Sequence, residues 1–353
     1  MSTGPRRAVA ATIADIDAAS DEPSLRAGLD GAHAAIAAEL AAHTPAITLA
    51  AAWSEVLRHS VAAAVRITGD TGRWAWFVSG SVARGEAAPG SDVETLAVLD
   101  DTVDDAGKAE LLARAAQVHA LLERCTVRGD ANGVLASRPR FCRRMGSWTE
   151  GIEAWTADPR ADRGVVMTGL VADSVGISGG VPPGAARLGV SDHALRAEVV
   201  AAVGRSRVAR QGLLQDATTL RAGFPSRLKM FTSGADTVDL KRAAVDPVVK
   251  IARWGALSAG SDAVYTLDRL DAAAAANILD ADDAASLREC FEWLLRFRWR
   301  HRAGPWLRGE RVSDVVLLPQ AAPQERAVLR TVAREVAGIS RKLTYLASAS
   351  SFH

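Results

Sequence analysis

Residues 76–101, WFVSGSVARGEAAPGSDVETLAVLDD, contain the alternation of apolar runs and turns that decides the fold. The apolar run 76–78 is followed by a Gly80-Ser81 turn, and a second turn, Pro89-Gly90-Ser91, precedes another apolar run at 96–99. Clusters of Gly, Pro and Ser favour turns, and short apolar runs between turns favour buried strands. The stretch therefore predicts a strand, a turn, a short helix, a second turn and a second strand.

Asp92 and Glu94 stand two residues apart at the head of the second apolar run. Because successive strand residues point to opposite faces, a strand here would put both carboxylates on one face. Carboxylates bind divalent ions, and free N–H groups at a neighbouring turn bind phosphate, so this face could hold metal ions and a triphosphate. The alternative is a capping box from Ser91 to Glu94 that opens a helix. The short, continuous apolar run that follows favours the strand.

The order Gly80-Ser81, a spacer and then Asp92-x-Glu94 resembles the nucleotidyltransferase signature of the polymerase β superfamily. The fuller text, which includes Arg84-Gly85-Glu86, resembles a bacterial family of signal-transduction nucleotidyltransferases, many of which also carry CBS or cyclic-nucleotide-binding domains. That family is related to the uridylyltransferase of the regulatory protein PII and to glutamine-synthetase adenylyltransferase. With further matching text in the C-terminal half, the resemblance covers roughly residues 35–345.

This resemblance implies Mg²⁺-dependent transfer of a nucleoside monophosphate from a nucleoside triphosphate to a hydroxyl group, with Mn²⁺ as an alternative metal. It implies that Asp92 and Glu94 are catalytic metal ligands. The residues that it implies in nucleotide binding are Gly80, Ser81, Arg84, Ser91 and Lys241. Two alternatives stay open for Arg84, which suits either a phosphate contact or an ion pair with Glu86 or Asp92.

The superfamily usually has a third carboxylate that activates the attacking hydroxyl. Asp173 is the preferred candidate and Asp130 the alternative, because the expected strand around residues 134–137 carries no acid. The arginine that follows this acid in the family is replaced here, since Ser174 and Val175 follow Asp173. These departures keep a catalytically weak or inactive nucleotide-sensing or scaffolding module open as an alternative.

By resemblance, the acceptor is expected to be a side-chain hydroxyl of a regulatory protein; a small molecule or an RNA end is the alternative. Arginines and aromatic residues interleave in residues 296–311, a composition that suits single-stranded nucleic acid. The same pattern also suits aromatic side chains in a core with arginines on a solvated face, and we favour that interpretation.

The chain of 353 residues has a formal net charge of +1, so no global charge attracts it to nucleic acid or to an anionic membrane. Its three cysteines, Cys125, Cys142 and Cys290, form no metal-binding spacing and no disulfide framework, which favours a reducing cytoplasm. We expect no secretion signal and no membrane span.

The predicted fold class is α+β, a polymerase β-type core with a small mixed sheet between helical regions. We expect N-terminal helices in residues 1–70, a nucleotidyltransferase domain in 71–180 and a helical, substrate-binding domain in 190–350. Within the middle domain, the pattern predicts a third strand at 134–137, a helix at 141–155 and a further strand or buried segment at 165–175. The Gly- and Pro-rich residues 176–189 are the best linker.

Overall fold

The computed structural model describes residues 4–177, 190–219 and 237–349, which form a small mixed sheet and many helices. The chain divides into two compact units, one made of Met1–Glu153 and Leu170–Val199, the other of Ala154–Gly169 and Val200–His353. The predicted α+β class is confirmed, and helices both precede and follow the strands of the sheet in chain order. The three-part division at about residues 70 and 190 stays a prediction.

Three helices open the first unit and pack on one another: α1 (Gly4–Ala18), α2 (Glu22–Ala41) and α3 (Ala46–Ile67). The Asp21 carboxylate accepts a hydrogen bond from the Ser24 N–H at 2.9 Å and so caps α2. Gly28 lets α1 approach closely, because a methyl group there would lie 2.9 Å from Ile16 Cγ1. The expected N-terminal helices are therefore present.

The sheet of the first unit has the strand order β3-β2-β1-β4. Its central pair, β1 (Trp74–Ser79) and β2 (Glu94–Leu99), is antiparallel. The edge strands are short: β3 (Cys142–Arg144) is parallel to β2, and β4 (Val175–Gly176) is antiparallel to β1. Every residue of β1 is buried, which explains why its sequence is a continuous apolar run rather than an alternating one.

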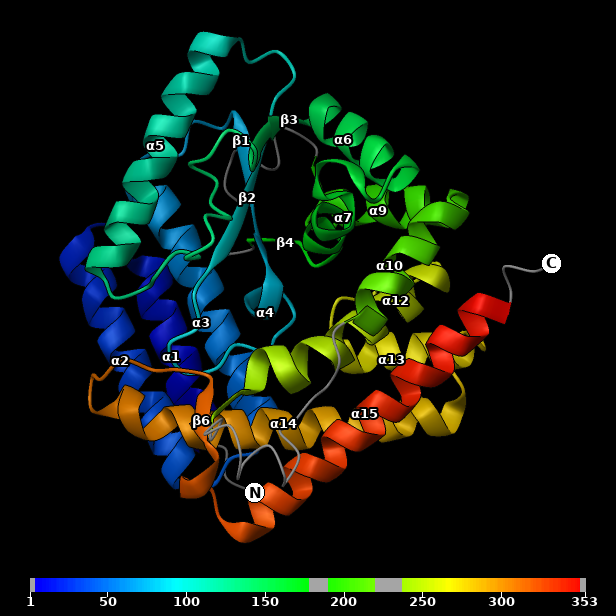
Figure 1. Ribbon diagram of the computed structural model, residues 1–353. Helices are drawn as coiled ribbons and strands as arrows, with labels where there is room; N and C mark the ends of the chain where they lie inside the picture. The colour runs from blue at the N-terminus through cyan, green and yellow to red at the C-terminus, as the bar shows by residue number, and fades with distance from the viewer. Residues whose placement is uncertain (1–3, 178–189, 220–236, 350–353) are drawn as a thin grey trace. The chain divides into compact units, whose positions relative to one another are not determined.

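Helix α5 (Asp105–Arg124) covers one face of this sheet and packs beside α3, as Figure 1 shows. From α5, His119 reaches the Thr95 hydroxyl at 3.1 Å and the Trp76 ring at 5.9 Å between centroids. Residues directly opposite in a sheet share a face, and neighbours along a strand do not. Glu94 and its partner Ser79 therefore point to the face opposite α5.

In the middle of the chain, the structure has the buried segment rather than the strand over most of 165–175, and the third strand predicted at 134–137 is wrong. The segment 165–175 is mainly a helix, α7 (Gly164–Ala172), and only β4 follows it; a short buried apolar run does not distinguish strand from helix. The third strand is β3, several residues after 134–137, where the chain turns instead. The expected helix at 141–155 begins later, as α6 (Met145–Ala157). Most of the predicted linker lies outside the described residues.

The second unit is mainly helical. Its described elements are α10 (Arg207–Thr219), a π-helix (Lys241–Val245), α12 (Asp246–Ser258), α13 (Thr266–Ala275), α14 (Ala281–Leu307), α15 (Pro323–Ala349) and the antiparallel pair β5 (Thr237–Asp239) and β6 (Val315–Leu317). Helix α9 (Ala194–Arg205) precedes α10, and single 3₁₀ turns lie at Ala161–Arg163 and Leu318–Gln320. Within the described ranges, no helix combines the length and the apolar character that a membrane span requires.

The arginine- and aromatic-rich part of α14 is divided between core and surface. Phe297 and Trp299 are buried, as the core interpretation predicts. Arg298 and Arg302 are also buried, and both donate to the carboxylate of Asp314, at 2.6 Å for Arg298 Nε and 2.8 Å for Arg302 Nη1. These two arginines therefore fasten the segment before β6 to α14 instead of facing solvent.

Candidate active site

The end of β1 and the start of β2 bring the Gly80-Ser81 turn and Glu94 together. The strands are antiparallel and Ser79 is directly opposite Glu94, so the residues that follow Ser79 lie at the same edge of the sheet as the residues that precede Glu94. After Ser79 the chain turns into a short helix, α4 (Gly80–Ala83). The turn and the Glu94 carboxylate, which a spacer separates in the sequence, thus meet in the fold.

Gly80 lies directly beneath the Glu94 carboxylate. Its φ is +65°, a conformation that disfavours residues with a side chain. A methyl group at this position would come within 2.5 Å of Glu94 Oε2. Glycine is therefore required both by the turn and by the close approach of the carboxylate.

Glu94 is the first residue of β2, and Asp92 precedes it by two residues. Both side chains are half-buried, whereas Val93 and Thr95 between and after them are buried. In the part of the chain that the structure describes, Asp92 makes no hydrogen bond or ion pair with another side chain. The head of β2 thus presents two carboxylates at the surface of the unit.

These two carboxylates fit a magnesium ion that takes its other ligands from phosphate and water, since Mg²⁺ is commonly held by one or two carboxylates together with substrate phosphates. Among the described residues, no group of three or more His, Cys, Asp or Glu side chains is arranged to hold a metal ion alone. The donor set therefore suits a metal that arrives with a nucleotide rather than a closed protein cage.

Arg84 connects the acids behind this pair. It is buried, its Nε donates to Glu86 Oε2 at 2.8 Å, and its Nη1 donates to Asp173 Oδ2. Burial alone would lower the pKa of Arg84, but Glu86, Asp173 and the nearby Glu94 outweigh it and raise the pKa further above its ordinary value. Arg84 is thus charged. Of the two alternatives, a phosphate contact or an ion pair, the structure has the ion pair with Glu86, and a second ion pair with Asp173 accompanies it.

Asp173 is brought to this site and is 2% exposed. It lies between α7 and β4, and β4 pairs with β1 through Val78 and Val175. Nearby, the Ser79 hydroxyl donates to the Leu170 carbonyl at 2.7 Å, which ties the end of β1 to the last turn of α7. The structure therefore joins Asp173 to the Gly80 turn through Arg84.

Asp130 lies on the other side of β2 and stabilises its own turn. Its backbone N–H donates to the Val93 carbonyl at 3.1 Å, next to a parallel bridge between Val93 and Gly129. Its carboxylate accepts from the Val134 N–H at 2.9 Å and from Asn132 Nδ2 at 3.2 Å. Both carboxylate oxygens are thus engaged in the turn, which explains why the chain does not extend into a strand here.

The two predicted serines have different surroundings. Ser81 is half-buried in the first turn of α4, and the side chain of the N-cap residue Ser79 makes no capping hydrogen bond to this turn. Ser91 is buried, and its Oγ accepts a hydrogen bond from the Ala88 N–H at 3.0 Å, so it closes the turn before Asp92. Lys241 belongs to the second unit, at the first residue of the π-helix, and its nucleotide contact stays a prediction.

Sequence reasoning missed two residues that support the site. Ser79 ties β1 to α7, and His119 holds the Thr95 hydroxyl on the opposite face of the sheet. Burial lowers the pKa of His119 to about 4, so its ring is neutral near pH 7. The Thr95 hydroxyl also accepts from the Ala136 N–H at 2.9 Å, which fixes the strand just after Glu94. In the sequence, the only local indication of these contacts was a polar residue next to an apolar run, Ser79 after 76–78 and Thr95 before 96–99.

Comparison with known families gives two matches, one in each half of the chain. Residues 31–162 match the family model described as "Putative nucleotidyltransferase DUF294", and these residues include Gly80, Arg84, Asp92 and Glu94. Residues 210–346 match a model described as "Putative nucleotidyltransferase substrate binding domain". No curated protein matches the chain.

Proposed function

The chain belongs to this family of nucleotidyltransferases, and we propose that it transfers a nucleoside monophosphate from a triphosphate to a hydroxyl group with Asp92 and Glu94 as metal ligands. The observation that carries the proposal is the close approach of the Glu94 carboxylate to the Gly80-Ser81 turn at one edge of the sheet, with Asp92 two residues before Glu94. Two carboxylates beside the start of a helix suit a metal-bound triphosphate.

Asp92 and Glu94 would hold Mg²⁺, or Mn²⁺ in its place, and the ion would supply charge neutralisation at the phosphates. Amides at the start of α4 and the Ser81 hydroxyl would bind the terminal phosphates, since the first amides of a helix have no partner within the helix. Arg84 acts indirectly: it is engaged with Glu86 and Asp173 and orients these acids behind the carboxylate pair.

We assign Asp173 as the base that accepts the proton of the attacking hydroxyl. The support is its position: Asp173 is connected to the Gly80 turn through Arg84, whereas the alternative, Asp130, lies beside Val93 on the other side of β2. Asp173→Asn should then abolish turnover with nucleotide binding retained. If Asp130→Asn abolishes turnover and Asp173→Asn does not, the assignment is wrong.

For the acceptor, we propose a side-chain hydroxyl of a regulatory protein, on the strength of the family resemblance. We place the reaction in the cytoplasm because Cys125, Cys142 and Cys290 are all buried and unpaired. An RNA end as acceptor would instead require binding that weakens steeply with salt.

The test is pyrophosphate release from each of the four nucleoside triphosphates with Mg²⁺ or Mn²⁺ and a cell extract as the source of acceptor. The test variant is Asp92→Asn/Glu94→Gln, and the matched control is Glu110→Gln/Glu123→Gln, which removes two exposed acids from α5. We expect release that needs both carboxylates and is unchanged in the control. Nucleotide binding without any release would instead support a sensing module that does not turn over.

A further inference from the structure

A cavity of about 380 Å³ that is open to solvent lies within the second unit, lined by α10, α12, α15 and the loop between α13 and α14. Each helix contributes residues from one face: on α10, for example, Arg207, Arg210 and Leu214 are spaced three and four residues apart. Its volume falls in the range of small-molecule sites, roughly 300–1,000 Å³. All of its lining residues belong to this one unit.

The charge of the cavity wall is positive. Arg207 and Arg210 line it, and no Asp or Glu does. Arg210 donates through Nη1 to the carbonyls of Val203 and Gly204, at 3.0 and 2.7 Å, so its guanidinium is held in place at the end of α9. A fixed guanidinium beside a second one, without a carboxylate in the wall, favours an anionic ligand.

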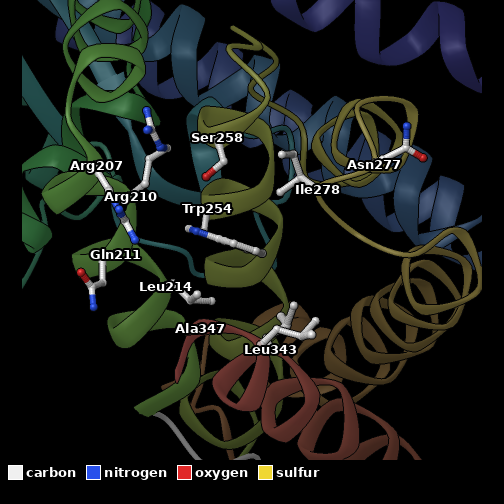
Figure 2. A pocket seen from close by; sticks show the side chains of 11 residues that line it. Arg207, Arg210, Gln211, Leu214, Trp254, Ser258, Asn277, Ile278, Leu343 and Ala347 are labelled. Carbon is white, nitrogen blue, oxygen red and sulfur yellow. The ribbon is translucent and has the colours of Figure 1, made fainter. Parts of the chain in front are cut away.

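The remaining wall is apolar and contains an indole ring. Figure 2 shows Trp254 between the α10 side chains and Ile278, with Leu343 of α15 below it. Trp254 is half-buried, so part of its ring faces the cavity. An aromatic ring beside cationic groups suits a ligand that has both a planar ring and a negative charge.

Two polar groups on the wall add directional contacts. Ser258 lies one turn after Trp254 on the same face of α12, and its buried Oγ has no hydrogen-bond partner among the described residues. Asn277, at the start of the loop before α14, has a positive φ of 55° and lines the cavity near Ile278. Buried hydroxyls without a partner are uncommon, and a ligand atom is one way to satisfy them.

We propose that this cavity binds a small aromatic anion, whose ring packs against Trp254 and whose carboxylate or phosphate group contacts Arg207 and Arg210. The ligand chemistry is common to nucleoside monophosphates and to aromatic carboxylates, and the binding experiment distinguishes them. The site shares no residue with the carboxylate pair of β2 and does not rest on the proposed transfer reaction.

The test is isothermal titration calorimetry of the full chain, without divalent metal, with AMP, UMP and indole-3-acetate as probes. Inorganic phosphate and adenosine are the comparators that lack the ring and the charge, respectively. We expect at least one probe to bind at least tenfold more tightly than both comparators. Binding of AMP or UMP alone would identify a nucleotide site, and binding of indole-3-acetate alone an aromatic carboxylate site.

Variants locate the binding. Arg207→Gln removes an exposed charge of the wall, and Ile278→Trp fills the cavity from a surface loop; each should weaken binding at least tenfold. The control Arg205→Gln removes an exposed arginine outside the cavity and should change nothing. Asp92→Asn/Glu94→Gln should also leave this binding unchanged, which separates it from nucleotide held at the β2 site.

Three results would overturn the proposal, the first two at the cavity itself. One is that no probe binds more tightly than its comparators. The other is that binding persists unchanged in both Arg207→Gln and Ile278→Trp, with circular dichroism confirming that the variants are folded. Loss of binding in Asp92→Asn/Glu94→Gln would likewise assign the probe to the other unit and remove the support for this cavity.

Discussion

Replacing Gly80 with alanine tests the assembly of the site most directly. Gly80→Ala has two effects: the positive φ of 65° costs an alanine about 1–2 kcal/mol, and the new methyl group meets Glu94 Oε2 at 2.5 Å. Since carbon and oxygen atoms in contact normally stand about 3.5 Å apart, the carboxylate must move by about 1 Å. A misplacement of this size can lower a rate by about 10²-fold.

Gly133→Ala is the matched control. Gly133 also has a positive φ, 82°, in the same unit, but a methyl group there meets nothing within 4 Å. Both variants should lose similar stability, a shift of roughly 2–8 °C in Tm, from the backbone strain alone. Only Gly80→Ala should lose activity, which thermal unfolding and the rate of pyrophosphate release measure together. Equal rates in the two variants would refute the role of Gly80 in positioning Glu94.

Three further predictions concern stability. Arg84→Met should lower the free energy of unfolding by about 3–5 kcal/mol, measured in urea, because it leaves two buried carboxylates without their cation; a loss below 1 kcal/mol would contradict this. Burial alone would raise the pKa of Asp314, but hydrogen bonds from Arg298 and Arg302 lower this pKa from 3.8 to about 2. Its ion pairs therefore stabilise the fold fully above pH 3.8, by about 2 kcal/mol, and this contribution is lost as pH falls through 2. The difference in free energy of unfolding between the wild type and Asp314→Asn should therefore shrink as pH falls from 3.8 to 2. A difference that stays constant over this range would contradict the prediction. Gly255→Ala should cost about 1–3 kcal/mol, since its methyl group would lie 2.7 Å from a side chain of α13, and an unchanged Tm would show that α12 and α13 separate freely.

The sequence predicts the parts of the site that are close together in the chain. The two turns, the short helix and the strand after Asp92 all follow from local patterns in residues 76–101, and the period of two places Asp92 and Glu94 on one face. The sequence does not show that Glu94 lies over Gly80, because that contact depends on the antiparallel register of β1 and β2.

The open alternatives and the errors lie where local patterns are ambiguous. The run at 165–175 is apolar on all sides, and such a run fits a buried helix as well as a buried strand. At 130–134 the Asp130 carboxylate accepts hydrogen bonds from its own turn, and this local contact competes with strand pairing. The sheet then gains its parallel edge strand only at β3, from three residues with little strand character.

The ion pairs of Arg84 show why the position of Asp173 relative to the Gly80 turn could not be predicted from the sequence. Arg84 and Asp173 are 89 residues apart, and no local pattern relates them. Because Ser174 and Val175 follow Asp173, the chain offers this acid no arginine from its own strand, yet the fold supplies a guanidinium from the end of α4. Burying two carboxylates against one arginine is stable only if both contacts are made, so Arg84 fixes where β4 can pair with β1. The same residue that the sequence suggested as a phosphate contact is therefore better understood as the connection between Asp173 and the end of α4, beside the carboxylate for which we propose metal binding.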